Sequence, residues 1–131
     1  MQASERPAVS PVVVVVEDDE DLLKAIAFSF SMEGYEVRPF ASAEALLADR
    51  DLPARACLVV DHHLPGMDGL DMLSRLRARG PAQPAVLITT PSATVSGRAL
   101  HDGVSVVEKP LLERRLIDEV ERQLAGLPGA A

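Results

Sequence analysis

The chain has 131 residues, a length that fits one domain with a sizeable hydrophobic core. Hydrophobic residues make up 47% and charged residues 25%, a balance that excludes wholesale disorder. The net charge of −7 argues against direct binding to nucleic acid or to an anionic membrane, because both favour clustered Lys and Arg. The apolar run Val12–Val16 is too short to span a bilayer, and residues 1–11 lack a secretory signal pattern. We therefore expect a cytoplasmic protein without a membrane partner.

The first half of the chain alternates strand-like and helix-like segments. After a polar leader over 1–11, the β-branched run Val12–Val16 is typical of a strand buried on both faces. Apolar residues then recur at helical spacing over 22–30, and Gly34 provides a stop signal. A second strand is predicted over 35–40, and Ser42 is a plausible N-cap for the short helix that follows it.

The second half repeats the same alternation. Three further strands are predicted at 56–60, 85–89 and 104–107. Helices are predicted at 70–76, before Gly80-Pro81, and at 112–124, before a flexible tail over 126–131. The stretch 94–101 is expected to make only a poor helix, because Thr94, Ser96 and Gly97 are weak helix formers.

Five strands that alternate with helices predict an α/β domain over 12–125. Such a chain forms a doubly wound parallel sheet with right-handed crossovers and helices on both faces. Five strands favour this sheet over a barrel of alternating strands and helices, which needs eight. The periodicity leaves the order of the strands in the sheet open.

Polar residues follow four of the predicted strands. In chain order they are Glu17-Asp18-Asp19, Asp61, Thr89-Thr90 and Glu108-Lys109-Pro110. The carboxyl ends of parallel strands share one edge of a sheet, where α/β proteins bind their ligands. Taken singly, each group has a plain structural role as a helix cap (Asp18, Asp19 or Asp21), a strand end or a surface charge. Their convergence on one edge is what favours a functional site.

The chemistry of this predicted cluster suits a metal ion and a phosphoryl group. Clustered carboxylates repel one another, and Mg²⁺ removes that conflict while still accepting phosphate oxygens. An incoming phosphoryl group would also meet Lys109, the hydroxyl of Thr89 and the backbone N–H of Thr90. Asp61 is the natural nucleophile, because carboxylates form aspartyl-phosphate intermediates.

These motifs resemble the receiver domain of two-component response regulators over about residues 12–124. The resemblance rests on the acidic pair after the first strand, Asp-x-x-Leu-Pro-x-x-Asp-Gly over 61–69, Thr89 after the fourth strand and Lys109-Pro110 after the fifth. It implies a flavodoxin-like strand order of 2-1-3-4-5 and a cis peptide between Lys109 and Pro110.

The resemblance also implies roles for individual residues. Asp61 is the phosphoacceptor, and Thr89 and Lys109 contact the phosphoryl oxygens. Asp18 binds Mg²⁺ directly, Glu17 holds it through water, and His63 contributes its backbone carbonyl. The spacing from Asp18 to Asp61 and Thr89 fits the family better than the spacing from Asp19.

The implied partners are a histidine kinase or a histidine phosphotransfer protein as donor, and a downstream protein target. A receiver catalyses only its own phosphorylation and dephosphorylation, so it is not an enzyme in the usual sense. No second domain follows in these 131 residues, so we expect a stand-alone receiver that signals by protein contact, unless the chain is part of a longer protein.

The chain departs from the family pattern in three places. Thr90 stands where Ala or Gly is usual, and the stretch from Thr89 to Lys109 is about two residues shorter than usual. Val106 occupies the position of the aromatic residue that reports phosphorylation in the family. We therefore predict a short or mobile helix over 92–102. Phe28 lies off the core stripe of its helix and is either a docking contact for a donor helix or a packing contact.

Two alternative functions remain open. A pseudo-receiver would keep the fold and bind partners without being switched by phosphorylation, which Val106 favours slightly. An aspartyl-nucleophile phosphatase typically needs a second Asp two residues after the first, and His63 stands there instead.

Overall fold

The computed structural model describes residues 11–80, 83–112 and 114–127. The predicted flexible leader and tail fall outside it over 1–10 and 128–131. Within the described ranges, no helix is long and apolar enough to cross a membrane.

Five parallel strands form a single sheet. The strands are β1 (Val12–Val16), β2 (Glu36–Phe40), β3 (Ala56–Asp61), β4 (Ala85–Thr89) and β5 (Ser105–Glu108). Their order is β2-β1-β3-β4-β5, as the resemblance implied. Val16, at the end of β1, pairs with both Phe40 and Val60. The carboxyl ends of the neighbouring strands therefore lie level at one edge, which is the edge where the site was predicted.

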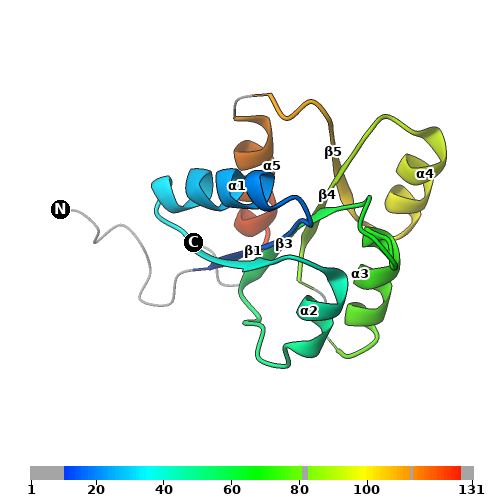
Figure 1. Ribbon diagram of the computed structural model, residues 1–131, viewed down its shortest axis with the longest axis horizontal. Helices are drawn as coiled ribbons and strands as arrows, with labels where there is room; N and C mark the ends of the chain where they lie inside the picture. The colour runs from blue at the N-terminus through cyan, green and yellow to red at the C-terminus, as the bar shows by residue number, and fades with distance from the viewer. Residues whose placement is uncertain (1–10, 81–82, 113, 128–131) are drawn as a thin grey trace.

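Helices cover both faces of the sheet. They are α1 (Glu20–Met32), α2 (Ala43–Ala48), α3 (Gly69–Arg77), α4 (Ala93–His101) and α5 (Arg115–Ala125). Val13 and Val15 pack with residues of α1 and α5, whereas Val12, Val14 and Val16 pack with residues of α2, α3 and α4. Figure 1 shows the same division between the two sides. Because β1 is covered on both faces, an uninterrupted run of valines suits it.

Local caps account for several helix boundaries. The Asp19 side chain accepts a hydrogen bond from the Leu22 N–H and caps α1. Ser42 accepts from the Ala45 N–H and caps α2, as predicted. Gly34 has a φ of 94° just after the C-cap of α1, a conformation that glycine adopts without strain. The stop signal predicted at Gly34 is thus confirmed.

The prediction for the start of the last helix was wrong. Leu112 was expected to open its apolar stripe, but α5 begins at Arg115 and Leu112 is 53% exposed. Residues 111–112 belong to the connection that leads from Pro110 to α5. The helical spacing of apolar residues cannot show where such a connection ends, so Leu112 matched the period by position alone.

The prediction of a poor helix after β4 was also wrong, because a continuous helix forms there. The helix α4 is continuous over nine residues, the same length as α3. Ser92 caps it by accepting a hydrogen bond from the Val95 N–H, and Ala99 is fully buried against the sheet side. Capping and tertiary packing therefore outweigh the weak propensity of Thr94, Ser96 and Gly97. The mobility of this helix stays a prediction.

Candidate functional site

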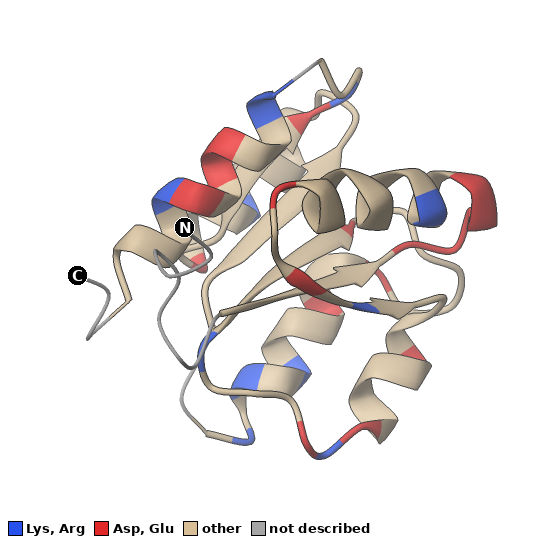
Figure 2. Ribbon diagram, turned by 90° about the vertical axis from the view of Figure 1, so that its left-hand side faces the viewer, with Lys and Arg blue, Asp and Glu red and all other residues tan. Residues whose placement is uncertain are grey.

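Three acidic side chains meet where β1 and β3 end. Glu17, Asp18 and Asp61 each place one carboxylate oxygen within 4.8 Å of the others. Glu17 and Asp61 are buried, whereas Asp18 is exposed. Figure 2 shows a continuous run of Asp and Glu residues along the segment that enters α1, among others spread over the molecule. The cluster therefore has a buried floor and one side open to solvent.

Asp18 and Asp19 have different roles in the structure. The Asp19 carboxylate caps α1, and the Asp19 N–H donates to Glu17 Oε2 at 3.1 Å. Asp19 therefore has a structural role, while Asp18 joins the cluster. The preference for Asp18 that the spacing suggested agrees with this arrangement.

Burial and mutual repulsion shape the titration of the cluster. Burial, reinforced by a hydrogen bond with Asp61 and by its charge, raises the pKa of Glu17 to about 7. Burial also acts to raise the pKa of Asp61, but hydrogen bonds from Glu17 and the His63 N–H, together with Lys109, lower it overall. The two shifts are opposite in direction, so a proton taken up by this pair favours Glu17 over Asp61.

The cluster fits a hard divalent cation. Glu17 Oε1 is buried beside the Asp61 carboxylate and accepts no hydrogen bond from an N–H group of the described residues, which leaves a carboxylate oxygen available to a cation. The donor set consists of carboxylate oxygens, and its open side leaves room for water. Mg²⁺ prefers oxygen ligands of this kind and keeps several waters.

Lys109 brings a positive charge to the phosphoacceptor candidate. Its Nζ lies 3.3 Å from Asp61 Oδ2, and its side chain is 30% exposed. The Lys109 N–H donates to the Thr89 carbonyl at 2.8 Å, which continues the pairing of β4 with β5. The peptide between Lys109 and Pro110 is cis, as the resemblance implied. Lys109 is thus held beside Asp61 by the end of the sheet.

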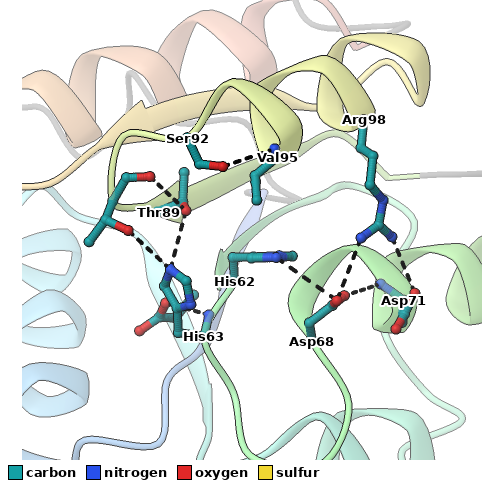
Figure 3. A network of polar contacts seen from close by, with 10 residues as sticks. His62, His63, Asp68, Asp71, Thr89, Ser92, Val95 and Arg98 are labelled. Atoms are coloured by element: carbon teal, nitrogen blue, oxygen red, sulfur yellow. Dashed lines mark hydrogen bonds and ion pairs between the residues drawn. The ribbon is translucent and has the colours of Figure 1, made fainter.

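Thr89 and Thr90 complete the edge from the side of β4. Thr89 is fully buried, and its hydroxyl donates to the Thr90 carbonyl at 3.0 Å. The His63 ring reaches across to both threonines, with Nε2 lying 3.3 Å from Thr90 Oγ1 and 3.5 Å from Thr89 Oγ1 (Figure 3). The His63 N–H donates to Asp61 Oδ1 at 2.9 Å. These ring contacts link the segment after β3 to the end of β4.

A close approach behind Asp61 was not foreseen from the sequence. A Cβ at Gly69 would lie 2.9 Å from both the Asp61 carbonyl oxygen and Val60 Cγ1, closer than real Cβ contacts occur. The Gly69 N–H donates to the His62 carbonyl at 3.0 Å. Only glycine allows this packing, and the Asp-Gly pair at 68–69 was the available signal.

The contacts of His62 were not predicted from the sequence either. His62 is buried beside Asp61, and burial is the main cause that lowers the pKa of its ring. Its Nε2 lies 3.9 Å from Asp68 Oδ2. These contacts could not be predicted from the sequence, because they depend on how the turn after β3 places Asp68 beside His62.

Phe28 and Val106 lie apart from the acidic cluster. The Phe28 side chain is 66% exposed on α1, in agreement with its predicted position off the core stripe. Val106 is half-buried and packs against the core on the side of α2, α3 and α4. No aromatic ring therefore stands at that position of β5.

The comparisons with known proteins agree with this geometry. The model of the response regulator receiver domain matches residues 13–121. The chain is 35% identical over 121 residues to the response regulator protein FleR of Pseudomonas aeruginosa, covering 90% of this chain and 26% of FleR. It is 32% identical over 114 residues to the transcriptional regulatory protein FixJ of Rhizobium meliloti, covering 84% of this chain and 55% of FixJ. The chain thus spans between about a quarter and about half the length of these relatives.

Solved structures show the same fold. The crystal structure of FixJ-N has a TM-score of 0.81 and 29% identity, covering 91% of this chain and 97% of that one. The receiver domain of NtrX from Brucella abortus has a TM-score of 0.77 and 30% identity, covering 88% and 99%. Family match, sheet order and the cluster of groups at the sheet edge lead to the same conclusion: the chain belongs to the response regulator receiver domain family of two-component systems.

Proposed function

We propose that Asp61 accepts a phosphoryl group from a phosphohistidine on a histidine kinase or a histidine phosphotransfer protein. The observation that carries the proposal is the pairing of a buried Asp61 with Lys109 Nζ at 3.3 Å, beside Glu17 and Asp18. A buried carboxylate next to one ammonium and two further carboxylates suits a nucleophile that meets an anionic group and a cation together. We place this signalling step in the cytoplasm.

The transfer would use the groups at this edge of the sheet together with Mg²⁺ and the donor histidine. An oxygen of Asp61 attacks phosphorus, the P–N bond to the donor imidazole breaks, and its electron pair returns to the ring nitrogen. Lys109 and the Thr89 hydroxyl bind the phosphoryl oxygens, with the Thr90 N–H beside them. Glu17, Asp18, Asp61 and the His63 carbonyl are the candidate Mg²⁺ ligands, with Glu17 acting through water. When bound, Mg²⁺ neutralises charge that develops on the phosphoryl oxygens.

Intact mass in the presence of Mg²⁺ and acetyl phosphate tests the proposal. We expect wild type to gain the mass of one phosphoryl group and Asp61→Asn to gain none. No gain in wild type, with the donor intact, would favour a pseudo-receiver. Rapid consumption of the donor without accumulation would favour a phosphatase or fast self-dephosphorylation, and a phosphate-release assay on both proteins measures it.

We further propose that Phe28 contacts the donor protein. It is one of two exposed large hydrophobic side chains on α1, with Met32 one turn further along the helix. Phe28→Ala should slow transfer from a phosphohistidine donor but leave the reaction with acetyl phosphate unchanged. Met32→Ala is the matched control on the same helix. Equal transfer rates for wild type and Phe28→Ala would assign Phe28 no role in docking.

The downstream partner is proposed to be a protein that reads the phosphorylated state by direct contact. Neither nucleic acid nor membrane is proposed as a direct partner of this domain, because its net charge of −7 disfavours both.

A further inference from the structure

The helix α4 is held by few apolar contacts. Of its nine residues, all of them described, Ala99 is the one that is fully buried. The neighbouring helix α3 has the same length and buries five residues. Polar contacts therefore take a larger share in holding α4 than in holding α3.

Arg98 provides the main polar contact from α4. Its Nη1 lies 3.6 Å from Asp68 Oδ2, and its Nη2 lies 3.2 Å from Asp71 Oδ1 (Figure 3). The planar guanidinium thus spans two carboxylates at the start of α3. The bridge connects segments 27 residues apart in the sequence.

Asp68 connects this bridge to the phosphoacceptor segment. Its Oδ1 accepts the Asp71 N–H at 2.8 Å and caps α3, while its Oδ2 faces both Arg98 and the His62 ring. The His62 carbonyl accepts the Gly69 N–H at 3.0 Å, and Gly69 lies directly against the Asp61 backbone. The orientation of Asp68 therefore depends on α4 on one side and on the backbone next to Asp61 on the other.

We propose that Arg98 is a positioning residue for phosphoryl transfer. By holding Asp68, it fixes the segment 61–69, which presents the Asp61 carboxylate and the His63 carbonyl. This inference rests on the proposed function. Because Asp68 contacts both Arg98 and the His62 ring, a displacement of the segment when Asp61 is phosphorylated should also displace Arg98 on α4. The bridge gives this chain a connection to α4 that does not use the half-buried Val106.

The same pair of helices contains a matched control. At the far end of α3, Arg77 Nη1 donates to the Asp102 carbonyl at 2.6 Å, at the C-cap of α4. Arg77 thus ties α3 to α4, as Arg98 does, but away from the start of α3 where Asp68 lies. Arg77→Met loosens α4 without touching Asp68, whereas Arg98→Met removes both contacts at the start of α3.

The first experiment needs neither a phosphoryl donor nor a metal. Amide exchange of the Gly69 and Asp71 N–H groups is measured in wild type, Arg98→Met and Arg77→Met. We expect both amides to exchange about fivefold faster in Arg98→Met, and less than about twofold faster in Arg77→Met. Unchanged exchange in Arg98→Met would overturn the proposal. Equal acceleration in the two variants would also overturn it, because general loosening of α4 would then explain the effect.

The second experiment measures the reaction. With acetyl phosphate and Mg²⁺, we expect Arg98→Met to phosphorylate about fivefold more slowly than wild type, Arg98→Lys to recover part of the rate, and Arg77→Met to match wild type. In wild type, exchange across 93–101 should change on phosphorylation, and in Arg98→Met that response should be lost. Wild-type rates and response in Arg98→Met would overturn the proposal. If wild type itself takes no phosphoryl group, the proposed function fails, and the exchange experiment still decides whether Arg98 holds the segment.

Discussion

The two halves of the site are built differently. The half formed by β1, β3 and α3 is closely packed: Glu17 and Asp61 are buried, Gly69 leaves no room for a Cβ, and α3 buries five residues. The other half, formed by β4 and α4, is more open only outside its strand: β4 is buried throughout, but Thr90 after it is exposed and Ala99 is the one fully buried residue of α4. The nucleophile candidate Asp61 thus lies on the packed half, whereas α4 lies on the open half. The open half has the smaller barrier to rearrangement, because fewer packed contacts must be broken.

The largest expected effect comes from comparing one buried leucine with one exposed leucine. Leu73 of α3 is 2% exposed, and Leu100 of α4 is 82% exposed. Leu73→Ala should lower the free energy of unfolding by about 3 kcal/mol, because it leaves a cavity in the core. Leu100→Ala should change it by less than about 0.5 kcal/mol. Urea denaturation of both variants measures the difference, and similar losses would show that α4 is anchored as firmly as α3.

Gly69 tests how tightly the packed half closes around Asp61. In Gly69→Ala the new Cβ meets the Asp61 carbonyl and the His62 Cα at 3.0 Å or less, and backbone must move to admit it. We expect a loss of about 2 kcal/mol in the free energy of unfolding and slower phosphorylation by acetyl phosphate. A variant with wild-type stability and rate would contradict the close packing described here.

The buried carboxylates should make stability depend on pH. The pKa of Glu17 is raised from 4.5 to about 7 in the folded state, so the folded protein binds more protons than the unfolded chain between these values. The free energy of unfolding should therefore fall by about 1–2 kcal/mol as pH rises from 4.5 to 7.

Glu17→Gln provides the control for this pH effect, since it keeps the shape and removes the titration. Denaturation at pH 5 and pH 8 should show a smaller pH effect in Glu17→Gln, and Mg²⁺ should restore wild-type stability at pH 8. The same dependence in both proteins would assign it to other groups.

The smallest effect concerns the open half. A Cβ at Gly97 would meet nothing within 4 Å, so Gly97→Ala should stabilise α4 by about 0.5–1 kcal/mol. In wild type we expect amides over 92–102 to exchange faster than those over 69–77. Gly97→Ala should reduce this difference in exchange rate. Strong protection throughout 92–102 in wild type would show that α4 is not mobile.

Much of the architecture was predictable because it rests on local patterns. Buried parallel strands need continuous apolar runs such as Val12–Val16, and helices show their period and their caps, as at Ser42 and Gly34. The strand order and the cis peptide at Pro110 came from the family resemblance and were confirmed. The start of α5 was misplaced at Leu112 because a connecting segment can imitate the helical period.

The sequence by itself determined the class of fold and the set of groups at the sheet edge, because strand periodicity assigns each of them to the end of a strand. The tertiary structure decided that Asp19 caps α1 while Asp18 joins Glu17 and Asp61. It also decided that the stretch after β4 folds into a complete helix, and that Arg98 reaches Asp68. These outcomes depend on contacts between segments far apart in the chain, and local propensity carries no information about such contacts.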